Sequence, residues 1–550
     1  TTSCKLLSFV ALASAALKTG VSASGFEPIA GYQPLTQVTD HNAIDLDMEV
    51  IHVELGFTSA SNLLRAKAFY TQGAYSGSYA ELTLNQIGGV TAFIPKGTQA
   101  AGNNKAGDKI EGTIMDDLEV GVTTMRVRYE TTKVQTEYSE CQVGALPITG
   151  FERTAGCFQN EGSIDIAGKG SYTYLYSVNV DNRNDRTLQK FSSNAESDKL
   201  LCDSFHNSCP HRTYSKFFNY YDVPDYGDRW ILAAFQQEKT RFVRGNADFS
   251  GYIGEGRAEA IKKGITCINV WMHVISKMEE AFDYCVSKDP RSFNSWDQAV
   301  AFYTGSMEGQ TGGSGFMLHA VANKRCVDFK TCGDAGDAVT GVAAVTQSIF
   351  RQFEVGQHHL NETDCDAVRS TKIRIEDMMA VPLVQGILRY AHIRGRQSDS
   401  EQSQAEGATF AASVLPLVHD CRPEDAAIIY ENMKVGSNVP DFIAVKKALE
   451  RNYKCMGISC SQVGGYYDDN NGEYYSDASP CVHSEGDGYN AALVQGLFFG
   501  LAVPLVLLGG WFFYKRRKRQ QEAELYPTAN SLVYPSSSND FCMKTGLSRI

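Results

Sequence analysis

Polar side chains recur at helical spacing on three stretches of this chain that are otherwise apolar. The stripes are Asp297, Thr304 and Glu308 in 293–313; Gln385, Arg389 and His392 in 375–393; and Glu406, Thr409 and Ser413 in 405–418. Carboxylates and imidazoles bind metals, and a guanidinium group holds anions. If the three faces converge, they line one polar cavity; if they do not, each stripe belongs to an ordinary packed helix.

The stretch 293–313 is expected to be a helix that runs into a glycine-rich turn after Glu308. Asn294 or Ser295 is a suitable N-cap. The apolar face holds Trp296, Val300 and Tyr303. Asp297 and Glu308 lie about 16 Å apart along the axis, so one metal ion cannot use both. Glu308, beside the glycine turn, is the better candidate.

Residues 226–460 show helical periodicity and predict a multi-helix bundle. The expected helices are 257–288 with a break at Gly264, 293–308, 342–355, 375–393, 405–418, 423–434 and 442–453. Residues 24–225 are instead rich in β-formers. Alternating patterns predict strands in 50–57, 123–134 and 172–180, with a short helix at 61–70. We therefore expect an α+β chain, with an N-terminal antiparallel, sandwich-like β module followed by the bundle.

The two ends predict a membrane protein. Residues 1–23 have the features of a secretory signal peptide. The uncharged stretch 491–514 is long enough to be a single transmembrane helix, and the basic run 515–519 follows it. This predicts a single-pass type I protein of the cell membrane with an extracellular N-terminal part. The tail 515–550 is then cytoplasmic and could recruit endocytic machinery, and the acidic, Tyr-rich stretch 461–490 is expected to be a stalk.

Charge and cysteine content fit an extracellular location. The net charge is −12, which disfavours nucleic acid as a partner and suits either cations or simple solubility. Most of the 15 cysteines are expected in disulfides. Their connectivity is open, and close spacing suggests Cys141/Cys157, Cys202/Cys209, Cys267/Cys285, Cys326/Cys332, Cys365/Cys421 and Cys455/Cys460, with Cys481 left over.

Several long motifs occur in order along the chain. They are GNADFSG at 245–251, GRAEAIKKG at 256–264, SWDQAVAFYTGSMEG at 295–309, NKRCVDFKTCG at 323–333, VPLVQGILRYA at 381–391 and AEGATFAASVLPLVHDC at 405–421. Together they resemble the phytotransferrins, the family of diatom iron-starvation-induced surface proteins and green-algal Fe-assimilating proteins. The resemblance spans about residues 140–465. It implies binding of ferric iron at the plasma membrane, with carbonate as a synergistic anion, followed by internalisation.

Ferric iron prefers carboxylate and phenolate oxygens and tolerates imidazole, and its carbonate needs a cation or a helix N-terminus. The candidate metal ligands are Glu308, Glu406, Tyr303, Tyr390, His392 and His419, and the candidate anion-binding residues are Arg389 and Thr304. Structural alternatives stand beside each of them. The tyrosines could pack in the core, His419 could complement a helix C-terminus, and Glu406 could favour a helix N-terminus. Arg389 and His392 could pair with acids on a solvated face.

The resemblance carries over no ligand set. Where the family has a Tyr-Val-Ile-Arg pattern, this chain has His273-Val274-Ile275-Ser276; if that tyrosine is a ligand, His273 would have to replace it. His359 and Glu362 form a His-x-x-Glu pair, but the glycosylation sequon at Asn361 implies an exposed loop there. Tyr-Asp clusters in 461–490 could collect iron loosely or serve as a solvated spacer.

Two other functions stay open from the sequence. A surface adhesion or scaffold protein would bind carbohydrate through its β module and use the bundle as support. A metallohydrolase would use His359 and Glu362, but no HExxH motif, nucleophile elbow or phosphate loop accompanies them. The sequence therefore favours a binding protein rather than an enzyme.

Overall fold

The computed structural model describes residues 26–481, apart from 27, 37, 58, 74–78, 86–88, 104–108, 131–141, 144–145, 148–157, 160, 177–186, 194–210 and 309–314. The predicted signal peptide, transmembrane helix and tail lie outside these residues, as do Cys141, Cys157, Cys202 and Cys209. Within the described part, no helix is both long and apolar enough to cross a membrane.

The described N-terminal part begins with helices. These are α1 (Thr39–Asn42), α2 (Ile44–Leu55) and α3 (Ala60–Gln72). The predicted helix at 61–70 is confirmed as α3, whereas the predicted strand at 50–57 is wrong. Helix α2 is buried around most of its circumference, so its apolar residues also occur at the alternate positions that are typical of a strand. This pattern explains the wrong prediction.

Six strands close into an antiparallel barrel in the order β1-β4-β3-β2-β7-β8. They are β1 (Tyr79–Leu84), β2 (Gln99–Asn103), β3 (Lys109–Ile114), β4 (Thr124–Glu130), β7 (Glu161–Ile166) and β8 (Gly170–Leu175). The short strands β5 (Gln142–Val143) and β6 (Leu146–Pro147) pair separately. Side chains alternate along β3, where Ile110 and Ile114 are buried and Lys109 and Glu111 are exposed. The α+β class is therefore correct, but the sheet is a closed barrel and not a sandwich.

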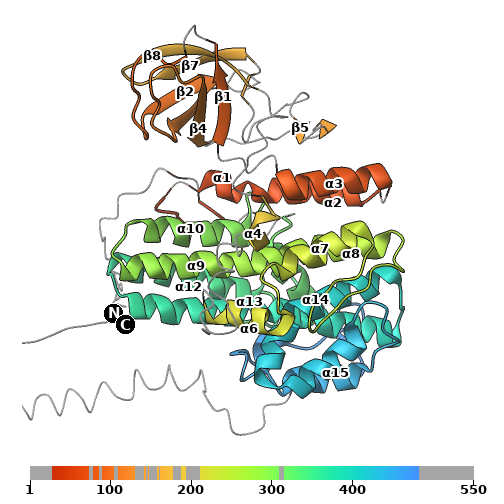
Figure 1. Cartoon of the computed structure of the whole chain (residues 1–550). Helices are drawn as coiled ribbons and strands as arrows, with labels where there is room; N and C mark the ends of the chain where they lie inside the picture. Colours follow the sequence, from red (N-terminus) through yellow and green to blue (C-terminus); the bar gives the residue numbers. More distant parts are fainter. Residues whose placement is uncertain are drawn as a thin grey trace, which may run out of the picture. The chain divides into compact units, whose positions relative to one another are not determined.

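The remaining helices form the bundle drawn in Figure 1. They are α4 (Lys190–Ser193), α6 (Arg212–Tyr221), α7 (Tyr226–Gln236), α8 (Glu255–Gly264), η1 (Ile265–Val270), α9 (Trp271–Val286), α10 (Arg291–Thr304), α11 (Leu318–Phe329), α12 (Ala344–Asn361), α13 (Cys365–Arg396), α14 (Glu401–Cys421), α15 (Pro423–Met433), α16 (Phe442–Glu450) and α17 (Cys460–Val463). The long helices α13 and α14 pack against each other, and α8 packs on α14. Helix α6 also packs on α14, although it precedes the predicted start of the bundle.

Gly264 does not break the first long helix. Helix α8 continues through the π-helical segment η1 into α9. A Cβ atom at Gly264 would lie 3.0 Å from side-chain atoms of Trp230 and Ile231, so the glycine allows α7 to approach closely. The wider π turn lets the chain keep helical hydrogen bonding past this contact.

Helix α10 is shorter than expected. It begins at Arg291 with Pro290 as its N-cap residue, so the predicted caps Asn294 and Ser295 lie inside it. It ends at Thr304 because Gly305 takes a φ of 82°, which a residue with a Cβ rarely adopts. The expected extension of the helix to Glu308 is therefore wrong.

Four disulfides join described residues: Cys285–Cys365, Cys326–Cys332, Cys421–Cys455 and Cys460–Cys481. Only the predicted pair Cys326/Cys332 is confirmed. The pairs Cys267/Cys285, Cys365/Cys421 and Cys455/Cys460 are wrong, and Cys267 is a buried free thiol. The pairs predicted from close spacing in the sequence are wrong because helix packing in the bundle joins cysteines up to 80 residues apart.

The predicted stalk is wrong over residues 461–481. Helix α17 is followed by the hairpin of β9 (Tyr467–Asp468) and β10 (Glu473–Tyr474), and the Cys460–Cys481 disulfide closes this segment. Tyr466 is 6% exposed and packs on Phe329 of α11. The tyrosines expected to be solvated are therefore partly used to attach this segment to the bundle.

Candidate functional site

The predicted binding residues lie at four places rather than around one cavity. Arg389, Tyr390 and Glu406 meet between α13 and α14. The other predicted residues are Tyr303, Thr304 and Glu308 at the end of α10, His392 beside 466–475, and His419 at the end of α14. The first group combines a phenol, a carboxylate and a guanidinium group, which is the chemistry expected for a metal ion with a bound anion.

Tyr390 and Glu406 form a buried hydrogen-bonded pair. The Tyr390 hydroxyl donates to Oε2 of Glu406, and Nε2 of Gln402 donates to Oε1 of the same carboxylate over 3.2 Å. The two helices approach closely here because a glycine faces the tyrosine. A Cβ atom at Gly407 would lie 3.0 Å from the Cβ of Tyr390. Gly407 thus allows the phenol of one helix to reach the carboxylate of the other.

The charge state of this pair follows from its surroundings. Burial raises the pKa of Tyr390 well above its usual value, and the charge of Glu406 raises it further. Burial is the largest single effect on Glu406 and opposes its ionisation, and the nearby Lys263 ammonium group counteracts burial. Two side-chain hydrogen bonds and the charge of Arg325 add to this effect, so the pKa of Glu406 lies below its usual value. At neutral pH the pair is a neutral phenol bound to a carboxylate.

Two guanidinium groups lie near the pair. That of Arg389 is centred 4.9 Å from the Tyr390 ring, and its Nε lies 3.2 Å from Oδ2 of Asp328. Arg325 places Nη2 3.0 Å from the same Asp328 oxygen. Its Nε and Nη1 atoms are buried and have no hydrogen-bond acceptor among the described residues. Buried donors without a partner are costly, so these N–H groups are suited to an anion.

A small cavity of about 30 Å³ opens beside Arg325, between the end of α8, α11 and α14. Its cationic lining is Lys262, Lys263, Lys324 and Arg325, and no acidic residue is among the described residues that line it. Glu259 pairs with both α8 lysines from outside the lining. Burial lowers the pKa of Lys324, and Lys263 and Arg325 lower it further. We call this space the basic cavity; its potential favours a small anion.

Glu308 is held in the turn that follows α10. Asp45 of α2 fixes this turn by accepting hydrogen bonds from Ser306 Oγ (2.7 Å) and Met307 N (2.8 Å). The Glu308 carboxylate is fully buried, with Oε2 3.4 Å from Nδ1 of His319. Neither of its oxygens has a hydrogen-bond partner in the described part of the chain. Glu308 is thus a second buried carboxylate, and its neighbour His319 was not among the predicted residues.

Tyr303 and Thr304 lie close to this turn. The Tyr303 hydroxyl is 3.2 Å from Thr346 Oγ1, and its ring packs 6.2 Å from that of His319. Burial raises the pKa of Tyr303, which keeps the phenol protonated. Thr304 Oγ1 is buried without a partner among the described residues. Tyr303 therefore has the satisfied hydroxyl and aromatic contacts of a core residue.

The two predicted histidines lie elsewhere. His392 packs against the rings of Phe442, Tyr466 and Tyr475, with centroids 5.0–5.2 Å apart, and burial lowers its pKa. His419 lies 5.2 Å from the ring of Tyr220, and burial lowers its pKa as well. Neither histidine is brought to the Tyr390–Glu406 pair.

The His-x-x-Glu pattern does not form the expected pair. Glu362 lies 3.3 Å from Nε2 of His358, not His359, and both partners are more than half exposed. Asn361 is the last residue of α12 and is exposed, as the sequon requires. This end of α12 is therefore accessible for glycosylation.

Asp297 has a structural role. It accepts hydrogen bonds from the Tyr32 hydroxyl (2.6 Å), the backbone N–H groups of Leu35 and Thr36, and the Thr36 hydroxyl, and so fixes the N-terminal segment on α10. Within the described ranges, no three His, Cys, Asp or Glu side chains are grouped to hold a metal ion. A metal at the Tyr390–Glu406 pair would therefore need phenolate and exogenous ligands as well.

Sequence reasoning missed the lysines and the arginine of the basic cavity. A signal was present, because two motifs, GRAEAIKKG and NKRCVDFKTCG, each place adjacent basic residues among small and apolar ones. Comparisons of this chain with protein-family models, with curated proteins and with solved structures find no match. Function is therefore inferred from the site and from the motif resemblance.

Proposed function

We propose that this chain is a cell-surface protein that binds ferric iron with carbonate as a synergistic anion for uptake, and that it is not an enzyme. The observation that carries the proposal is the buried Tyr390–Glu406 pair beside the unpartnered N–H groups of Arg325. The resemblance of its motifs to the phytotransferrins supports the same function. The cell-surface location rests on the predicted signal peptide and transmembrane helix.

The pair suits a hard trivalent cation. Fe(III) favours phenolate and carboxylate oxygens, and it would replace the proton that Tyr390 now donates to Glu406. The phenol loses its proton to solvent, and both oxygens become available to the metal. Because burial and the Glu406 charge raise the pKa of Tyr390, a highly charged metal is needed to displace that proton at neutral pH.

The basic cavity makes the anion necessary. Without an anion, an incoming Fe(III) ion meets the positive charges of Lys263, Arg325 and Arg389, against two nearby carboxylates, Glu406 and Asp328. Carbonate adds two negative charges and can accept hydrogen bonds from the free N–H groups of Arg325. Bound carbonate and the Tyr390 phenolate then offset the repulsion of the metal by the lysines and arginines. Iron binding is therefore expected to depend strictly on carbonate.

Equilibrium dialysis of the full-length chain against ferric nitrilotriacetate, with and without bicarbonate, tests the proposal. We expect one tightly bound Fe(III) and a visible phenolate-to-iron charge-transfer band only when bicarbonate is present. Tyr390→Phe should lose the band. Tyr303→Phe, which removes the phenol near Glu308, should keep it. Absence of bound iron under both conditions would overturn the function, and equal binding without bicarbonate would overturn the role of the anion.

A further inference from the structure

A second, much larger cavity lies along α9, away from the Tyr390–Glu406 pair. Its volume is about 430 Å³, within the range of small-molecule sites. Residues of α4, the start of α6, η1 and α9 line it. On α9 the lining runs from Met272 to Tyr284, which is about 18 Å of helix axis. The cavity is therefore elongated along this helix. We call it the acidic cavity.

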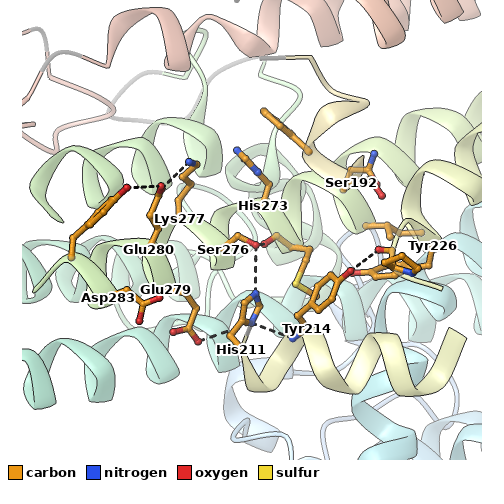
Figure 2. A pocket seen from close by; sticks show the side chains of 16 residues that line it. Ser192, His211, Tyr214, Tyr226, His273, Ser276, Lys277, Glu279, Glu280 and Asp283 are labelled. Carbon is orange, nitrogen blue, oxygen red and sulfur yellow. Dashed lines mark hydrogen bonds and ion pairs between the residues drawn. The ribbon is translucent and has the colours of Figure 1, made fainter. Parts of the chain in front are cut away.

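Its two ends differ in chemistry, as Figure 2 shows. The carboxylates of Glu279, Glu280 and Asp283 gather at one end. Tyr214 and Tyr226 lie at the other end, where Phe191, Ile268 and Met272 also contribute to the lining. A ligand that fills the cavity must therefore have one polar, positively charged end and an apolar body.

At the acidic end, two of the three carboxylates form ion pairs with lysines and the third does not. Lys277 pairs with Glu280 over 2.8 Å, and Lys372 pairs with Glu279 over 2.5 Å. Asp283 is exposed to solvent and forms no ion pair with any described residue. Burial raises the pKa of Asp283, and the charge of Glu279 raises it further. The charges of Arg369 and Lys372 act on this pKa in the opposite direction. Because three carboxylates and a single ammonium group, that of Lys277, belong to the described lining, the cavity still favours a monocation and disfavours anions.

The two histidines of the lining add no positive charge. Burial lowers the pKa of His211 to about 3 and that of His273 far below its usual value. Nδ1 of His211 accepts from the backbone N–H of Tyr214, so the ring proton is on Nε2, which faces Ser276 Oγ at 3.5 Å. His211 is thus engaged in fixing the start of α6.

His273 differs from His211, because its ring nitrogens have no hydrogen-bond partner among the described residues. Its ring stacks on Phe191 at 3.8 Å and meets the edge of Phe302 at 4.7 Å, and its side chain is 5% exposed. Neither ring nitrogen forms a hydrogen bond with any described residue, and the ring lines the cavity. The ring nitrogens are therefore available on the cavity side, and a ligand hydroxyl or amide could hydrogen-bond to them.

We propose that the acidic cavity binds an elongated organic monocation: a protonated amine on an apolar chain or ring that carries a hydrogen-bonding group at its far end. The amine lies at Asp283 and Glu279, the apolar body lies against Met272 and Phe191, and the far group reaches His273. The site shares no residue with the Tyr390–Glu406 pair, so it stands independently of the proposed iron binding.

A matched set of small probes tests this site on the full-length chain without iron. The probes are 6-amino-1-hexanol, its neutral analogue 1,6-hexanediol and its anionic analogue 6-hydroxyhexanoate, followed by saturation-transfer NMR and calorimetric titration. We expect the amino alcohol to bind, the diol to bind at least about fivefold more weakly, and the acid not to bind. Equal affinity for the amine and the diol would overturn the proposal, and so would an absence of amine binding at millimolar concentration.

Two variants locate the ligand. Asp283→Asn changes an exposed side chain and should fold normally, and it is expected to weaken 6-amino-1-hexanol about fivefold. Asp334→Asn removes an exposed carboxylate elsewhere in the bundle and should leave the affinity unchanged. In His273→Phe the stacking on Phe191 is retained, but the preference for 6-amino-1-hexanol over hexylamine should disappear. An unchanged affinity in Asp283→Asn or an unchanged preference in His273→Phe would contradict the assignment.

Discussion

The basic and the acidic cavity lie along the same continuous helical segment, from α8 through η1 to α9, and carry opposite charge. Lys262 and Lys263 end α8 and line the basic cavity, whereas Glu279, Glu280 and Asp283 of α9 line the acidic one. One helix thus presents a cationic end and an anionic end to two separate spaces. The overall charge of −12 predicts neither.

The two cavities also differ in how their polar groups are satisfied. Beside the basic cavity, Arg325 has two buried nitrogens without an acceptor in the part of the chain that the structure describes. In the acidic cavity, two of the three carboxylates already have lysine partners, and the neutral ring of His273 lines the space. An anion therefore has most to gain in the first space, and a hydrogen-bonding monocation in the second.

Arg325→Gln should have the largest effect on iron affinity. It also separates the two cavities most clearly, because it should change iron binding and leave amine binding unchanged. Removing the guanidinium group takes away the donors that hold carbonate, so iron affinity in bicarbonate should fall about 100-fold. Binding of 6-amino-1-hexanol should not change. Equilibrium dialysis with radioactive iron and calorimetry with the amine measure the two effects on the same sample.

Arg351→Gln is the matched control, because Arg351 is an exposed arginine of α12. It should leave both affinities unchanged. If iron affinity in Arg325→Gln equals that of the unmodified chain, Arg325 does not hold the anion. If both ligands weaken together, the variant has disturbed the fold, and Arg325→Lys, which keeps the charge but not the forked donors, then separates structure from anion binding.

Lys263→Met should move the pH at which iron is released. Lys263 helps to hold the pKa of Glu406 below its usual value, so its removal raises that pKa. A proton then competes with iron for Glu406 at a higher pH, and the release midpoint should move upward by roughly one pH unit. Iron retention is measured across pH 4–7.

Lys262→Met is the control, because Lys262 lines the same cavity but is not among the groups that shift the pKa of Glu406. Equal shifts in both variants would show that only the summed charge matters.

The sequence was sufficient for the long, periodic helices, but it did not predict α6, α7 or α11, and it was insufficient for the contacts between helices. Helices α13, α14 and α15 are long and strongly periodic, so 375–393, 405–418 and 423–434 are all confirmed as helical, although α13 is much longer than predicted. The strand predicted at 50–57 failed because a short helix buried on several sides leaves no distinctive period. Disulfide pairs failed because connectivity depends on how helices pack and not on the spacing between cysteines.

The site was predicted in part for the same reason. Arg389 and Glu406 were selected from stripes that are each local to one helix, and Tyr390 was selected as a phenolate candidate; the structure brings these three side chains together. Lys263 and Arg325 meet this group only because α8 packs on α14 and α11 packs on α13, and no local pattern encodes those contacts. Glu308 was selected as a wall of the same cavity, yet the φ of Gly305 ends α10 early and turns the chain toward α2 and His319.

Asp45 is a buried carboxylate, and no cation of the described residues acts on its pKa. It can therefore be compared with the carboxylates near the two cavities, and its titration is expected to have the smallest effect of those predicted. Burial raises its pKa from 3.8 to about 6, although hydrogen bonds from Ser306 and Met307 oppose the shift. The folded state therefore binds this proton more tightly than the unfolded state does. The resulting stabilisation is complete below about pH 4 and is lost as the pH rises through about 6.

Urea unfolding at pH 7 and pH 5 measures this contribution. When the pH is lowered from 7 to 5, the free energy of unfolding of the unmodified chain should rise by about 1 kcal/mol relative to that of Asp45→Asn. The asparagine cannot titrate; its Oδ1 can still accept the hydrogen bond from Met307 N, and its Nδ2 can instead donate to Ser306 Oγ. Asp334→Asn, at an exposed site, should keep the full pH dependence. If Asp45→Asn keeps it too, Asp45 is already solvated in the folded chain, and burial without a nearby cation does not distinguish this carboxylate from Glu406.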